Sequence, residues 1–103
     1  MRGKTTAMME KVIDLLAELP EDAHVHITGA HPRWIRELEH LFKQSGLVDV
    51  HFFTAGQVAN GALLGRRGVL LIDDWDEIPI CYVGKVLEAQ RYLAVQLKGH
   101  NDA

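Results

Sequence analysis

Cysteine is nearly absent from this chain of 103 residues, in which Cys81 is the only thiol. A single cysteine excludes an internal disulfide and any zinc site built from several cysteines, so we expect a reducing, cytoplasmic setting. No apolar run approaches the roughly 20 residues that a membrane-spanning helix needs. The residues after Met1 also lack the hydrophobic segment of a secretion signal. We therefore expect a protein that is neither membrane-bound nor secreted.

An excess of positive charge is also missing. Lysine and arginine number 11 against 14 aspartates and glutamates, for a formal charge of -3. This balance argues against a protein that coats nucleic acid through its overall field, although a local basic patch stays open. With 48% hydrophobic residues, residues 1–103 are expected to form one domain around one core.

Hydrophobic spacing predicts alternating helices and strands. Three segments have apolar residues at helical intervals: Met9–Leu19, Trp34–Phe42 and Val83–Leu97. Three shorter segments are apolar or alternating, as strands are: His24–Thr28, Val48–Phe53 and Val69–Ile72. A short helix is expected at residues 57–64. The unbroken apolar run at residues 69–72 is typical of a strand that is buried on both faces.

This order predicts an α/β fold, a small three-layer sandwich with a mostly parallel sheet of about three strands. Ligands of such sheets bind at the carboxyl ends of the strands. The segments expected at that edge are residues 28–31, 54–56 and 73–77. The last of these is acidic.

The motif Gly3-Lys4-Thr5-Thr6 stands immediately before the first predicted helix, which is expected to begin near Thr5 or Thr6. Amide groups at a helix N-terminus favour phosphate, a lysine there reaches phosphate oxygens, and a hydroxyl can ligate Mg²⁺. The motif is only the second half of G-x-x-x-x-G-K-[ST], and so short a string also occurs by chance.

Two carboxylates, Asp73 and Asp74, follow the apolar strand at residues 69–72. In phosphoryl-transfer sites the first such carboxylate holds Mg²⁺ and the next orients the attacking water. The bland alternative is that both cap the turn, while Asp76 and Glu77 favour the positive end of the following helix. Both interpretations stay open on the sequence alone.

Taken in order, these segments resemble the nucleotide-binding core of P-loop NTPases, particularly the motor domains of nucleic-acid helicases and of the large terminase subunits of tailed phages. Gly3–Thr6 looks like the end of a Walker A loop and Val69–Asp74 looks like Walker B. His26–Arg33 and Phe52–Thr54 are similar in position to the motifs between them. The resemblance covers about residues 3–77.

The resemblance implies ATP and Mg²⁺ as cofactors. It implies that Gly3, Lys4, Thr5 and Thr6 bind the phosphates, that Thr5 and Asp73 hold the metal, and that Asp74 is the catalytic residue. The first strand and the first half of the Walker A loop are missing, and Asp74 stands where the family usually has Glu. The implied function is a partial or degenerate P-loop NTPase domain, an ATPase if the nucleotide site is complete, with DNA-packaging or helicase-like activity and nucleic acid as a further partner.

A different class of function is also consistent with the sequence. A non-catalytic interaction module, phage-encoded for example, would use the same scaffold to bind a protein partner or a second copy through an exposed sheet edge.

Three histidines and the cysteine have their own interpretations. His24 and His26 share one face of a strand, and His51 on a neighbouring strand could join them at a metal, although such histidines more often satisfy local hydrogen bonds. Cys81 is expected to be a small buried residue.

Overall fold

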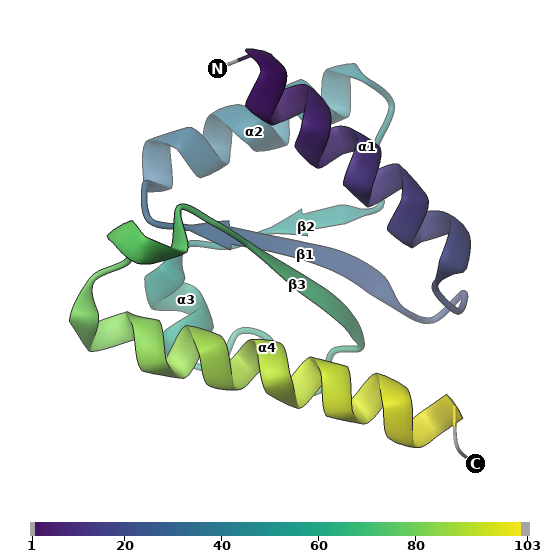
Figure 1. The fold of residues 1–103 in the computed structure, drawn as a ribbon, viewed down its shortest axis with the longest axis vertical. Helices are drawn as coiled ribbons and strands as arrows, with labels where there is room; N and C mark the ends of the chain where they lie inside the picture. The colour runs from purple at the N-terminus through teal and green to yellow at the C-terminus, as the bar shows by residue number, and fades with distance from the viewer. Residues whose placement is uncertain (1, 102–103) are drawn as a thin grey trace.

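The structure is a computed structural model, and it describes residues 2–101, in which helices and strands alternate as the sequence predicts (Figure 1). In chain order the elements are α1 (Arg2–Glu18), β1 (His24–Gly29), α2 (Pro32–Gln44), β2 (Val50–Phe52), α3 (Ala55–Ala59), β3 (Gly68–Asp73), the 3-10 turn η1 (Trp75–Glu77) and α4 (Ile80–Asn101). The predicted α/β class is confirmed.

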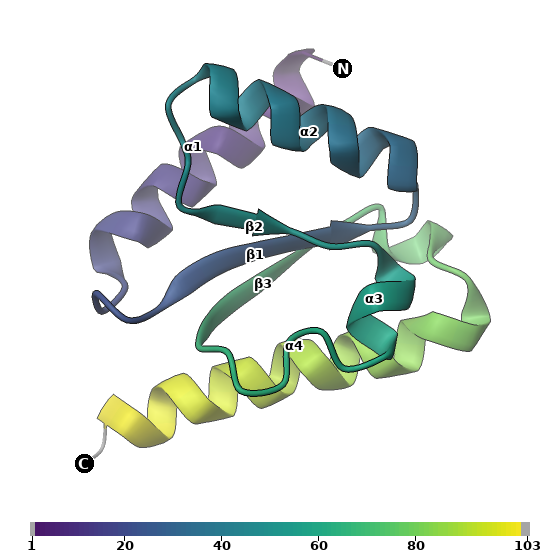
Figure 2. The ribbon, with the colours of Figure 1, turned by 180° about the vertical axis from the view of Figure 1, so that it is seen from behind.

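The three strands form one parallel sheet in the order β2-β1-β3. Helices α1 and α2 cover one face of the sheet, and α3 and α4 cover the other (Figures 1 and 2). The connection from β1 to β2 passes through α2, while the connection from β2 to β3 crosses to the opposite face through α3. This is the three-layer sandwich with about three parallel strands that the sequence predicts.

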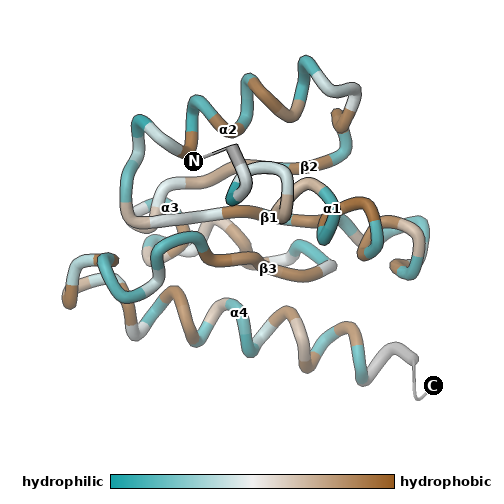
Figure 3. The backbone as a smooth tube through the Cα atoms, turned by 45° about the horizontal axis from the view of Figure 1, so that its top comes forward, coloured by the Kyte–Doolittle hydropathy of each residue, from teal (hydrophilic) through white to brown (hydrophobic). Residues whose placement is uncertain are grey.

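Each face of the sheet has its own apolar core. The core under α1 and α2 consists of Val12, Val25, Ile27, Ile35, Leu38, Phe42 and Val50. The core under α3 and α4 consists of Ala55, Val58, Leu63, Leu70, Ile78, Val86 and Leu93. In Figure 3 the strands carry long hydrophobic stretches, and the helices alternate between hydrophobic and hydrophilic residues, because only one side of each helix faces the sheet.

The first helix begins earlier than predicted. It starts at Arg2 rather than near Thr5 or Thr6, so the motif Gly3–Thr6 lies inside its first turn instead of before it. No proline interrupts these residues, and a single glycine does not stop a helix. The short helix predicted at 57–64 is also displaced: α3 covers residues 55–59, because Thr54 and Gln57 form a reciprocal capping box at its start.

Strand β3 packs against the apolar cores on both faces of the sheet, as the run at residues 69–72 predicts, but its burial is incomplete. It lies at the edge of the sheet and pairs only with β1, so Val69, Leu71 and Ile72 remain partly exposed. Cys81 is exposed rather than buried, because it lies in the first turn of α4, where the neighbouring Ile80 is also 93% exposed. Among residues 2–101 no helix is long and apolar enough to cross a membrane.

Replacing Gly68 with alanine should destabilise the fold. Gly68 begins β3 with a φ of 131°, and an added Cβ would lie 1.7 Å from the carbonyl oxygen of His24. We expect the free energy of unfolding, measured by urea denaturation, to fall by at least about 2 kcal/mol. Gly84→Ala on α4 is the control, since nothing lies within 4 Å of its added Cβ, and it should stabilise by about 0.5–1 kcal/mol. An unchanged stability of the Gly68→Ala variant would contradict this close approach.

Candidate functional site

The carboxyl ends of β1 and β3 lie side by side, with Gly29 opposite Asp73 in the register of the two strands. The chain leaves β1 toward α2 on one face and leaves β3 toward α4 on the other (Figure 1). Such a divergence opens a crevice outside the ends of parallel strands, where ligands of α/β sheets bind. An added Cβ on Gly29 would make a tight contact of 3.0 Å with the carbonyl oxygen of Asp73, so the two strand ends approach closely at the floor of this crevice.

Lys4 reaches into the crevice from the first turn of α1. Its Nζ lies 2.5 Å from Oδ1 of Asp74 and 3.1 Å from Oδ1 of Asp73. Hydrogen bonds to the carboxylates of Asp74 and Asp73 raise the pKa of Lys4 above its ordinary value of 10.5, so the ammonium is charged at neutral pH. Two residues that are 70 positions apart in sequence are therefore joined by an ion pair.

The two carboxylates differ in their surroundings. The side chain of Asp73 is only 3% exposed, and its Oδ2 has no hydrogen-bond partner among the described residues. Asp74 is more open and has a left-handed backbone conformation, with a φ of 50°. Since a buried carboxylate oxygen without a partner is costly, Asp73 is a polar group that is suited to a cation or to a water bound to one.

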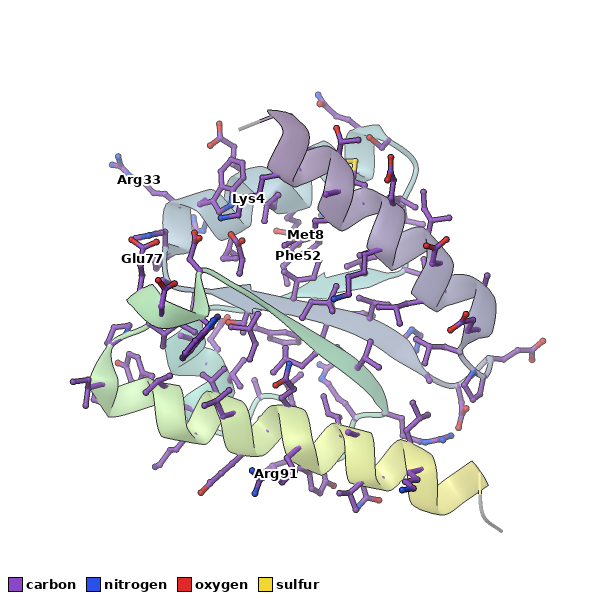
Figure 4. The ribbon with its side chains drawn as sticks, in the orientation of Figure 1. Lys4, Met8, Arg33, Phe52, Glu77 and Arg91 are labelled. Carbon is purple, nitrogen blue, oxygen red and sulfur yellow. The ribbon has the colours of Figure 1, made fainter. Side chains whose placement is uncertain are left out.

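Two further side chains complete the crevice. His31 precedes α2, and Glu77 ends the turn η1; His31 Nε2 lies 3.4 Å from Glu77 Oε1. Together with Lys4, Trp34 and Asp74 they line a pocket of about 340 Å³. Figure 4 shows Lys4 and Glu77 at the same end of the molecule, where β1 and β3 terminate.

The structure therefore brings together three of the residues that the sequence singled out, namely Lys4, Asp73 and Asp74. The other three site residues from the sequence analysis are Gly3, Thr5 and Thr6. They lie beside Lys4 at the start of α1, where Gly3 and Thr6 are exposed and Thr5 is half-buried.

Sequence reasoning assigned no function to His31 or Glu77 at this crevice. The available signal was position, because residues 28–31 and 73–77 follow strands whose carboxyl ends share one edge of the sheet. What could not be read from sequence is that His31 turns toward the loop after β3.

Neither family models, nor curated proteins, nor solved structures match this chain. The interpretation of the crevice therefore depends on its geometry.

A second polar cluster lies on the α3 and α4 face of the sheet. The ring centroid of His51 is 5.1 Å from that of His24 and 5.5 Å from that of His26. His26 Nε2 lies 3.1 Å from the carbonyl oxygen of Arg67, which can only accept, so Nε2 carries the proton and the buried Nδ1 is left without a partner. The three imidazoles meet as the spacing predicted, and His26 forms the local hydrogen bond of the alternative interpretation.

Burial makes His26 difficult to protonate. Desolvation lowers the pKa of His26 from 6.5 to about 4, and it lowers the pKa of His51 as well. In the unfolded chain His26 is protonated below about pH 6.5, whereas in the folded chain it stays neutral until the pH falls to about 4. The contribution of His26 to the free energy of unfolding is therefore fully present above pH 6.5 and is lost as the pH falls from 6.5 toward 4.

The pH dependence of unfolding should reveal this histidine. Between pH 7 and pH 4.5 His26 should remove on the order of 2 kcal/mol from the free energy of unfolding, measured by urea denaturation. The His26→Leu variant should lose less stability over that range, by about this amount. His40→Leu, a change at an exposed position on α2, should leave the pH dependence unchanged. Parallel curves for His26→Leu and the original chain would show that His26 is not the group responsible.

Proposed function

We propose that this chain binds a nucleoside triphosphate with Mg²⁺ at the carboxyl end of its sheet, as a partial, P-loop NTPase-like domain. The observation that carries the proposal is the contact of Lys4 with Asp73 and Asp74, at 3.1 and 2.5 Å. It joins a lysine in the first turn of a helix to two carboxylates at a strand end, the pairing that the resemblance requires. DNA-packaging or helicase-like activity and a nucleic-acid partner are proposals that depend on this binding, and a cytoplasmic location is proposed from the single cysteine.

The residues of the crevice suit a phosphate chain and its metal. Lys4 and the amide groups of the first turn of α1 would bind phosphate oxygens, with Thr6 and Gly3 on the same turn. Thr5 and the unpartnered oxygen of Asp73 would face the metal, and a bound Mg²⁺ would neutralise charge on the phosphates. Asp74 would orient a water molecule for attack once Lys4 has turned from it to the phosphates.

A place for the base is also present. A groove of about 640 Å³ begins at Lys4 and is walled by Met8, Leu87 and Trp75. The indole of Trp75 is 60% exposed, and an exposed indole is a surface on which a nucleobase stacks. The groove therefore continues from the phosphate end of the crevice to an aromatic wall.

Calorimetric titration with ATP and Mg²⁺ tests the proposal. We expect micromolar binding, and we expect Lys4→Ala to weaken it at least about tenfold, or 1.4 kcal/mol, because the phosphate contact is lost. Lys98→Ala is the control, since Lys98 is an exposed lysine of α4 that lines neither the crevice nor the groove. Absence of binding at millimolar ATP, or equal losses in both variants, would contradict the proposal.

The alternative, a protein-interaction module, is favoured by the open edge of β3, and the partner that fits it is a second copy of this chain. Arg67 offers its carbonyl oxygen to His24, so residues 68, 70 and 72 direct their backbone groups to the free edge. Antiparallel pairing of two copies about Leu70 would place Arg67 of one opposite Asp73 of the other, which is complementary in charge.

Gln90 tests this alternative, because its Nε2 donates to the carbonyl oxygen of Leu70, 3.0 Å away, and so blocks the edge. If two copies pair here, Gln90→Ala should tighten dimerisation several-fold in sedimentation equilibrium by freeing that carbonyl group. Gln96→Ala, at an exposed position of the same helix, should leave the dimerisation constant unchanged. A chain that stays monomeric in both variants at millimolar concentration would remove the alternative.

A further inference from the structure

We propose that His31, Asp74 and Glu77 form a binding site for a divalent transition-metal ion, of the Mn²⁺, Co²⁺ or Zn²⁺ class. Within residues 2–101, one potential ligand atom from each of these three side chains lies within 4.8 Å of the other two. Ligand atoms around a bound ion of this class lie about 3–4 Å apart, so a small closure of exposed side chains would complete the site.

The loops after β1 and β3 supply the three ligands. His31 and Asp74 are the residues that precede α2 and η1, and neither side chain makes the capping hydrogen bond to its helix that this position permits. Both side chains are instead directed into the crevice, where His31 lies 3.4 Å from Glu77. Their position at the helix starts is therefore not explained by capping.

A second observation concerns Asp73, which shares Lys4 with Asp74 beside this group. Asp73, next to Asp74, has a side chain that is 97% buried and an oxygen, Oδ2, without a partner. Lys4 is the cation nearest to both aspartates, and it has a single ammonium group for two carboxylates. Asp73 and Asp74 thus hold more negative charge than Lys4 neutralises.

The donor set decides the class of metal. One imidazole nitrogen with two carboxylates is a mixed set that suits Mn²⁺, Co²⁺ and Zn²⁺, whereas Mg²⁺ prefers oxygen ligands alone. Three protein ligands leave coordination positions for water or a phosphate oxygen. These three metal ligands differ from the metal ligands that the family resemblance implies, which are Thr5 and Asp73.

The inference shares Asp74 with the proposed nucleotide site, so its test uses the metal ion alone. Titration with Co²⁺, followed by calorimetry and by quenching of tryptophan fluorescence, should give one site of micromolar affinity, because Trp34 lines the same pocket. Mg²⁺ should bind at least about tenfold more weakly. His31→Ala and Glu77→Gln should each weaken Co²⁺ binding at least about tenfold.

Two matched controls separate coordination from charge. His40→Ala removes an exposed histidine of α2, the helix that follows His31, and Asp76→Asn removes a carboxylate from the same turn as Glu77. Each variant should change Co²⁺ affinity less than about threefold. Loss of Co²⁺ binding in His51→Ala instead of His31→Ala would place the ion at the cluster of His24, His26 and His51, and it would overturn the inference. Equal affinities for Mg²⁺ and Co²⁺, or no Co²⁺ binding at millimolar concentration, would overturn it as well.

The Lys4→Ala variant distinguishes this inference from the nucleotide proposal. Removing the ammonium frees Asp74 of a competing cation, so Co²⁺ should bind several-fold more tightly, while ATP should bind more weakly. Loss of Co²⁺ binding in Lys4→Ala would contradict the metal site. Retained Co²⁺ binding in a chain that does not bind ATP would refute the nucleotide proposal alone.

Discussion

The central strand β1 is paired on both edges with parallel neighbours, and five of its six residues are buried. Parallel pairing requires each connection to cross over a face of the sheet, which is why α2 lies on one face and α3 on the other. The same pairing sets the ends of β1 and β3 together while their following loops diverge. The crevice that holds Lys4, Asp73 and Asp74 is thus a consequence of how β1 is paired.

The sequence was sufficient for the alternation of elements, because apolar spacing determines it, while the grouping of Lys4 with the aspartates in one site came from the family resemblance. The sequence was insufficient to show that β3 lies at the edge of the sheet, since a short apolar run looks the same whether a strand has one neighbour or two. Cys81 shows the same limit, because its exposure depends on where α4 begins relative to the sheet. The part played by His31 depends on the path of two loops, which no local pattern encodes.

The two faces of β1 carry different kinds of side chain, apolar on one face and polar on the other. Val25 and Ile27 lie in the apolar core under α1 and α2, whereas His26 and Thr28 alternate to the side of α3 and α4. On that side Nδ1 of His26 and the hydroxyl of Thr28 are buried without a hydrogen-bond partner among the described residues. Each such group costs about 1–3 kcal/mol, so the face under α4 contributes less stability for a given buried area. Acid should weaken this face, because burial lowers the pKa of His26 there.

Lys4 couples the two ligands proposed for the crevice. Its ammonium lies 2.5 Å from the carboxylate that both the metal and the attacking water would use. A phosphate that draws Lys4 away from Asp74 leaves that carboxylate free for a cation, and a cation on Asp74 releases Lys4 for phosphate. By linkage each ligand then strengthens the binding of the other by the same factor. An internal ion pair at the end of β3 would therefore make the two proposed ligands, phosphate and metal, cooperative.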